Sequence, residues 1–200
     1  MSDQPQLSQE MINDFVVAAH SDLDKVRTQL AEHPALLNEN AVWIETPIQA
    51  AAHVGNREIA EFLLDQGAPL DICAAAMLGL RDEVSAFLTE MPELVNAVGA
   101  HNIPLMFFAA LNGDTAVAQQ LYDAGTPINA DSDSQSALHG AVLGAHVAMT
   151  RWLMDRDANP YAVDFEGKTA FDRAEERGLT EIADILRPFF AVDEETGDGA

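Results

Sequence analysis

The chain has 200 residues, enough for one domain or one continuous array of repeats, and 48% of them are apolar, which can supply a long core. Its 33 acidic and 10 basic residues give a formal net charge of −23. That charge argues against nucleic-acid binding and against an anionic membrane surface, because both need clustered Lys and Arg.

The N-terminus and the cysteine content argue against further classes of protein. The segment MSDQPQLSQE lacks the basic and apolar regions of a secretion signal, and no apolar run approaches the ~20 residues of a membrane span. Cys73 is alone, so neither an intramolecular disulfide nor a Cys-based metal site is expected. We expect a cytoplasmic, monomeric protein with a flexible N-terminus over residues 1–7.

The first helical pattern begins at Ser8 and buries Ile12 and Phe15 on one face. Asp22 can cap a second helix that carries Val26 and Leu30. This helix pair lacks the turn motif found later in the chain, as terminal repeats often do.

The clearest pair follows in the stretch TPIQAAAHVGNREIAEFLLDQGAPLD, which starts at Thr46. Thr46 can cap a helix, Pro47 suits its first position, and Gly55 ends it. A second helix follows and Gly67 closes it. The pattern resembles the ankyrin repeat, T-P-L-H-x-A-A-x-x-G followed by L-L-x-x-G-A, with Gln49 in place of the motif His.

The resemblance implies an all-α ankyrin-repeat solenoid of about six stacked helix-turn-helix repeats joined by short hairpin fingers. Asp24–Asn38 reappears as Asp82–Asn96 with a shared E-x-P-x-L-x-N extension, so the first four repeats look like a duplicated pair, as in some bacterial ankyrin proteins. One domain over residues 8–190 would hold repeats at approximately 8–40, 41–69, 70–97, 98–129, 130–161 and 162–190, followed by a disordered acidic tail over 191–200.

The repeat spacing indicates that one finger is truncated. Equivalent inter-helix positions recur at about 33 residues, but Gly55 and Leu80 are about eight residues closer than that. Gly67 therefore runs almost directly into the next helix near Ile72, and we expect a notch in the row of fingers.

No catalytic residue, cofactor site or metal site is predicted. The six His residues are spread over four repeats without an H-x-x-x-H pair, and His139 occupies the structural His position of the motif. His20 and His53 hold equivalent places on successive first helices, so they could form a pH-sensitive contact or a merely exposed pair. The alternative function, an enzyme or a metal-dependent activity in the concave groove, requires His20, His53 or Cys73 to converge with carboxylates.

The leading hypothesis is a protein-protein interaction module without catalysis. In ankyrin proteins, partners meet the finger tips and the first-helix residues before the motif Gly. Trp43 is the expected anchor, although it could instead pack on the neighbouring helix. From Asp82 to Thr150 the chain has no Lys or Arg, so the charge fits either solubility or steering of a basic partner. The residues predicted to bind the partner are Trp43, Glu45, His53, Val54, His101, Ile103, Leu111, Asn112, Asp133, Gln135, Leu143 and Glu166.

Overall fold

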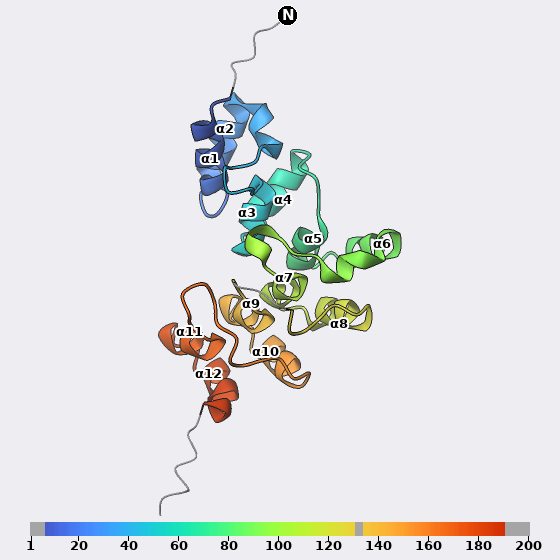
Figure 1. Ribbon diagram of the computed structural model, residues 1–200. Helices are drawn as coiled ribbons and strands as arrows, with labels where there is room; N and C mark the ends of the chain where they lie inside the picture. The colour runs from blue at the N-terminus through green and yellow to red at the C-terminus, as the bar shows by residue number, and fades with distance from the viewer. Residues whose placement is uncertain (1–6, 131–133, 191–200) are drawn as a thin grey trace, which may run out of the picture.

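A computed structural model describes residues 7–130 and 134–190, and in this part of the chain the protein is all-α. Twelve α-helices form six pairs that follow one another from α1–α2 at one end to α11–α12 at the other (Figure 1). The expected six helix-turn-helix repeats are therefore confirmed. Most of the flexible N-terminus and the whole acidic tail predicted above lie outside the described residues.

The α-helices are short, as those of repeat proteins usually are, and each pair has a first and a second helix. The first helices of the pairs are α1 Gln9–Ala18, α3 Pro47–His53, α5 Ile72–Leu78, α7 Leu105–Asn112, α9 Ala137–Leu143 and α11 Ala170–Glu176. The second helices are α2 Leu23–Glu32, α4 Arg57–Asp65, α6 Arg81–Glu90, α8 Thr115–Asp123, α10 Val147–Met154 and α12 Thr180–Leu186. Four short 3-10 helices are η1 Pro34–Asn38, η2 Pro92–Asn96, η3 Ala100–Asn102 and η4 Arg187–Phe189.

The start of α3 shows why the turn motif forms a helix. Thr46 Oγ1 accepts from the backbone N–H of Gln49, and Gln49 Oε1 accepts from the backbone N–H of Thr46 at 3.1 Å. This reciprocal capping box satisfies two backbone donors that a helix start leaves unpaired. At the start of α9, His139 holds the equivalent position, and its Nδ1 accepts from the backbone N–H of Ser136. Gln49 thus caps its own helix start as the motif His does.

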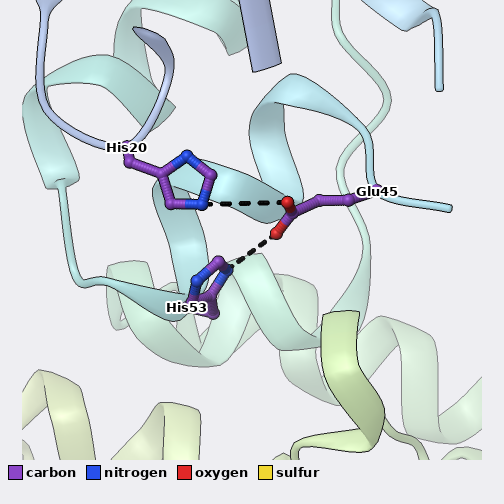
Figure 2. Close-up of side chains that lie close together, drawn as sticks. All are labelled: His20, Glu45 and His53. Atoms are coloured by element: carbon purple, nitrogen blue, oxygen red, sulfur yellow. Dashed lines mark ion pairs between the residues drawn. The ribbon is translucent and has the colours of Figure 1, made fainter. Parts of the chain in front are cut away.

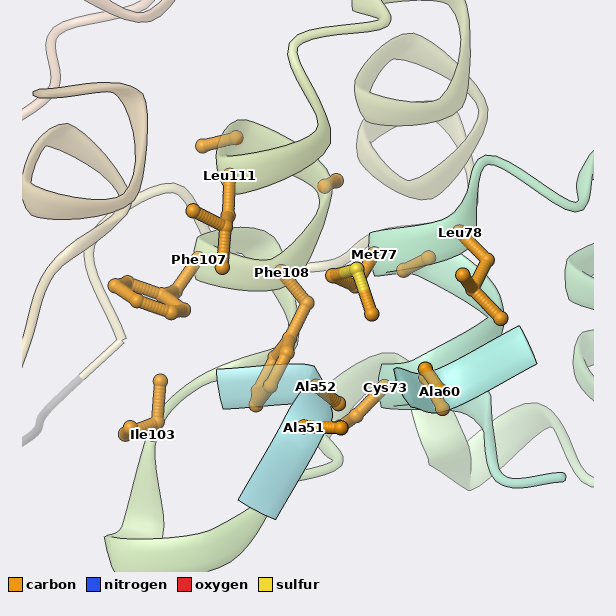
Figure 3. Packing of buried hydrophobic residues seen from close by; sticks show 14 of the residues in the cluster. Ala51, Ala52, Ala60, Cys73, Met77, Leu78, Ile103, Phe107, Phe108 and Leu111 are labelled. Carbon is orange, nitrogen blue, oxygen red and sulfur yellow. The ribbon is translucent and has the colours of Figure 1, made fainter. Parts of the chain in front are cut away.

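The first helices form a continuous row in which α1, α3, α5, α7, α9 and α11 contact one another in sequence. Small side chains permit this close approach, since the alanines of α3 and α5 are almost completely buried. At Gly140 in α9, an added Cβ would lie 2.5 Å from the carbonyl oxygen of Phe107 in α7. Phe107, Phe108 and Leu111 of α7 belong to the same core as Cys73 of α5, and Phe108 is the one that lies near Cys73 (Figure 3).

The duplicated stretch adopts the same backbone twice. After α2, His33 has φ −135° and ψ 75° and leads into η1. After α6, Met91 has φ −136° and ψ 79° and leads into η2. The matching E-x-P-x-L-x-N segments therefore fold alike, as a duplicated pair of repeats requires.

The connection between the second and third repeats is short, as predicted. Residues 68–71 run straight into α5, whose first turn is capped by Asp71 Oδ1 accepting from the N–H of Ala74 at 2.7 Å. The next finger, residues 97–104, closes with a bridge between Val98 and Pro104. Gly99 in this finger lies against α5 and α7, because a Cβ there would meet Phe108 at 2.5 Å. Its 3-10 helix η3 contacts α3, so the following finger covers the expected notch.

Leu63 in α4 tests the stacking directly. Its side chain is fully buried between repeats, so Leu63→Ala is expected to lower the free energy of unfolding by ~2–5 kcal/mol through lost burial and a residual cavity. Equilibrium urea denaturation followed by circular dichroism measures the change. Leu143→Ala makes the same truncation at a position that is 38% exposed and is expected to cost far less. A loss below ~0.5 kcal/mol at Leu63 would contradict the packing described here.

Candidate functional site

A buried carboxylate lies at the base of the finger that precedes α3. Glu45 is 0% exposed, and its backbone carbonyl accepts from the N–H of Ala41 at 3.0 Å, which closes the finger over residues 41–45. Its side-chain Oε2 accepts a hydrogen bond from the indole Nε1–H of Trp43 at 2.6 Å. The finger therefore turns Glu45 inward and fixes one of its two oxygens.

Three histidines from three repeats surround this carboxylate. His20 follows α1, His53 ends α3, and His101 lies in η3; Figure 2 shows the first two pointing at Glu45. The distances to Glu45 are 3.7 Å from His20 Nε2 to Oε2, 2.9 Å from His53 Nδ1 to Oε1 and 3.5 Å from His101 Nε2 to Oε1. The rings lie edge to face, with centroids 5.0 Å apart for His20 and His53 and 5.2 Å apart for His53 and His101. We call these four residues the Glu45 cluster.

The environment keeps Glu45 ionised. Burial acts to raise the pKa of Glu45, but the contact with His53 and the hydrogen bond from Trp43 outweigh it, so the pKa lies below its ordinary value. Oε1 nevertheless receives no well-aligned hydrogen bond, although two ring nitrogens lie within 3.5 Å of it. The carboxylate is therefore charged and only partly satisfied.

Backbone carbonyls orient two of the rings. His20 Nδ1 lies 3.0 Å from the carbonyl oxygen of Val16, and His53 Nδ1 lies 3.2 Å from that of Gln49. A carbonyl oxygen only accepts, so Nδ1 carries the proton in the His20 contact. In a neutral His20 ring, Nε2 then presents its lone pair toward the carboxylate of Glu45.

An open recess adjoins the cluster. It has a volume of about 340 Å³ and is lined by His53, His101, Ile103, Gln135 and Phe165, among others. A second recess of about 310 Å³, toward α11, also includes Phe165 in its wall. Phe165 is 69% exposed, and its backbone N–H donates to the carbonyl of Ser134 at 3.0 Å, which ties the fifth finger to the sixth.

The predicted partner-binding residues divide into surface and interior positions. Glu45, Ile103 and Leu111 are buried at 0%, 2% and 7% exposure, so they cannot contact a partner directly and these three predictions are corrected. Ile103 lies in the finger that crosses α5, Leu111 packs beside Gly55, and the Glu45 side chain turns inward to Trp43. Position-by-position transfer from the motif shows none of these contacts. Asp133 lies outside the described residues. The remaining predicted residues are at least partly accessible: Trp43, His53, Val54, His101, Asn112, Gln135, Leu143 and Glu166.

Trp43 remains partly exposed and is held by a hydrogen bond within its own finger. Its ring is 38% exposed, while its N–H is tied down to Glu45. The neighbouring Ile44 is 82% exposed and has φ 62°, an unusual value for a β-branched residue. Ile44 and Phe165 were not among the predicted site residues, although an apolar side chain in a finger loop was the same signal that singled out Trp43.

Two other sequence predictions are explained by contacts. His139 Nδ1 accepts from the N–H of Ser136 and its Nε2–H donates to the carbonyl of Lys168 at 3.0 Å, so it is a structural link between fingers. Burial lowers the pKa of His139 and keeps the ring neutral. Cys73 is buried, and burial raises its thiol pKa well above the usual range, which removes it as a nucleophile.

Comparison with known proteins identifies the family. The ankyrin repeat model matches residues 45–75, and a model of three ankyrin repeats matches residues 105–193. Together with the helix pairs and their capped turns, these matches show that the chain belongs to the ankyrin-repeat proteins.

Two relatives place the chain within a broad group. A Treponema pallidum (strain Nichols) protein described as ankyrin repeat-containing is 29% identical over 174 residues, covering 82% of this chain and 58% of that protein. The E3 ubiquitin-protein ligase hecd-1 of Caenorhabditis elegans is 30% identical over 110 residues, covering 48% of this chain and 4% of the ligase. The chain thus spans less than two thirds of either relative. Among the described residues, no helix has the length and apolar character to span a membrane.

The charge of Glu45 is expected to appear in the pH dependence of stability. Because its folded-state pKa lies below the ordinary value of 4.5, ionised Glu45 favours folding above that value, and this contribution is lost as the pH falls through the lowered pKa. The free energy of unfolding of the wild type minus that of Glu45→Gln should therefore decrease between about pH 6 and pH 3. Urea denaturation at several pH values measures it.

Glu90→Gln, at an exposed position of α6, is the matched control for this titration. The free energy of unfolding of the wild type minus that of Glu90→Gln is expected to change much less over the same pH range. An equally flat difference for Glu45→Gln would show that the folded state does not favour the ionised form of Glu45.

Proposed function

We propose that this ankyrin-repeat protein binds a protein partner across its finger tips and the concave side of its first helices, without catalysis. The observation that carries the proposal is the concentration of exposed apolar side chains on the fingers. Contiguous exposed apolar residues mark interaction sites, whereas single ones are ordinary. Val42, Trp43 and Ile44 are exposed and consecutive on one finger. The exposed apolar residues on the second, fourth and sixth fingers are Val42, Trp43, Ile44, Val98, Val163 and Phe165.

Trp43 and Phe165 suit the role of anchors. Aromatic side chains that enter a partner's pocket supply a large share of binding energy in many interfaces. Trp43 is held by its hydrogen bond to buried Glu45, and the backbone of Phe165 is held by Ser134. Such pre-ordering reduces the conformational entropy that binding would otherwise remove.

The charge favours a basic partner through long-range attraction. The described acidic residues of the stretch that lacks Lys and Arg are mostly exposed and lie on or near α6 and α8, the second helices of their pairs, and not on the fingers. They would therefore act on the approach of a partner more than on the docked contact. This separation gives the apolar anchors and the acidic charges distinguishable kinetic effects.

The anchor test compares the wild type with three variants in affinity capture, followed by kinetics on the protein that the wild type retains. Trp43→Ala and Phe165→Ala are each expected to increase the dissociation rate at least about tenfold, because a buried aromatic anchor acts after contact. Met91→Ala is the control, since Met91 has the same 38% exposure as Trp43 but follows α6 away from the fingers. If all three variants changed the dissociation rate equally, or if none changed it, the proposal that the fingers bind the partner would be wrong.

The charge test uses Glu90→Gln combined with Glu93→Gln on the same partner. Both residues are exposed, and the double variant is expected to slow association at low salt while leaving dissociation unchanged. The difference should vanish at high salt, where the Debye length falls to about 3 Å. An association rate indifferent to both salt and substitution would mean that the charge serves solubility and that the partner is not basic.

A further inference from the structure

We propose that the Glu45 cluster binds a divalent transition-metal ion of the Zn²⁺ class, with His20, Glu45 and His53 as ligands and His101 as the fourth. This proposal is argued from the cluster alone, which shares the hydrogen bond between Glu45 and Trp43 with the partner-binding surface. It joins residues from the first, second and fourth repeats that have no sequence spacing typical of a metal motif.

The geometry brings three of the four ligands together, and His101, which lies 3.5 Å from Glu45 Oε1, would have to move toward the other two histidines. One ligand atom from each of His20, Glu45 and His53 can be chosen so that all three lie within 4.8 Å of one another. Ligands about 2.0–2.1 Å from a tetrahedral Zn²⁺ lie roughly 3.3 Å apart. The ring-to-carboxylate distances are 3.7 Å to Oε2 and 2.9 and 3.5 Å to Oε1, and His53 reaches Oε1 through the Nδ1 that also contacts the Gln49 carbonyl. Binding therefore requires the His53 ring to turn from that carbonyl so that a deprotonated nitrogen faces the ion.

The electrostatics of the cluster favour a cation. Glu45 is a fully buried carboxylate whose Oε1 receives no aligned hydrogen bond, and burying a charge is costly unless it is compensated. A neutral His20 ring would face its Nε2 lone pair toward this anion, since its Nδ1 is engaged by Val16. A metal ion between them satisfies both the lone pair and the carboxylate.

The donor set selects the type of ion. Imidazole nitrogens with one carboxylate suit Zn²⁺ and its first-row neighbours, whereas Mg²⁺ and Ca²⁺ prefer oxygen ligands alone. The contacts around the ligands resemble the outer shell of a metal site, because Trp43 fixes a carboxylate oxygen and the Val16 carbonyl fixes the His20 ring. The adjoining recess reaches His53 and His101, so the ion has a path from solvent.

His101 completes the site because of the truncated connection. It has φ 57°, a left-handed conformation that few non-glycine residues adopt, and its finger lies across α5 to reach α3. With 46% of its side chain exposed, it is the most accessible of the three histidines. His101 can therefore be exchanged with little effect on the core.

The test titrates the full, chelator-treated chain with Zn²⁺ alone in isothermal calorimetry, with excess Mg²⁺ present to occupy the many surface carboxylates. We expect one Zn²⁺ per chain, and at least a tenfold loss of affinity in Glu45→Gln, His53→Gln and His101→Asn. His33→Gln is the matched control, because His33 follows α2 and has no contact with the cluster among the described residues. Circular dichroism of each variant checks that it is folded.

Co²⁺ provides a second readout on the same variants. A tetrahedral site with imidazole ligands gives Co²⁺ an intense visible absorption, which should be present in the wild type and in His33→Gln and absent in Glu45→Gln. Zn²⁺ binding that persists unchanged in folded Glu45→Gln and His53→Gln would overturn the proposal, as would a failure of Zn²⁺ to bind in excess Mg²⁺. Unchanged affinity in His101→Asn alone would overturn the assignment of the fourth ligand.

Discussion

The close packing of the first helices determines the other distances in this protein. Alanines line the contacts between α3 and α5, and Gly140 lets α9 approach the backbone of α7. Residues at equivalent positions of successive repeats are therefore brought to within one side-chain length of each other. His20 and His53 illustrate the result, since their ring centroids are 5.0 Å apart although α2 and the second finger separate them in the chain. When the same residue type recurs at equivalent positions, the regular spacing of the first helices therefore brings those side chains together.

Glu45 connects the interior of the array to its proposed binding surface. A buried, ionised carboxylate lowers stability by several kcal/mol unless neighbours compensate its charge. Here Trp43 donates to one oxygen and His53 lies 2.9 Å from the other, so the finger tip and the cluster share a single residue. Under the two proposals, an ion in the cluster would hold Glu45 in place and, through it, the exposed face of Trp43. Metal occupancy and partner binding would then be linked through one hydrogen bond.

The fold was predictable because its determinants are local. Thr46 and Pro47 start a helix and Gly55 ends it through caps that need only neighbouring residues, and a deletion in the spacing revealed the short connection after Gly67. The Glu45 cluster was not predictable in the same way. His20 and His53 could be paired from their repeat positions, but His101 reaches Glu45 only because its finger crosses a neighbouring repeat. The burial of Ile103 follows from that same displacement, whereas Leu111 is buried beside Gly55 at the end of α7.

The short connection at residues 68–71 also changes how the array can come apart. In most repeat arrays each unit contacts only its neighbours, so structure can be lost one unit at a time. Here η3 in the fourth repeat contacts α3 in the second, and Gly99 rests on the α5 and α7 helices between them. The second, third and fourth repeats are consequently fastened together by contacts that skip a unit. We therefore expect this central segment to unfold as one cooperative block.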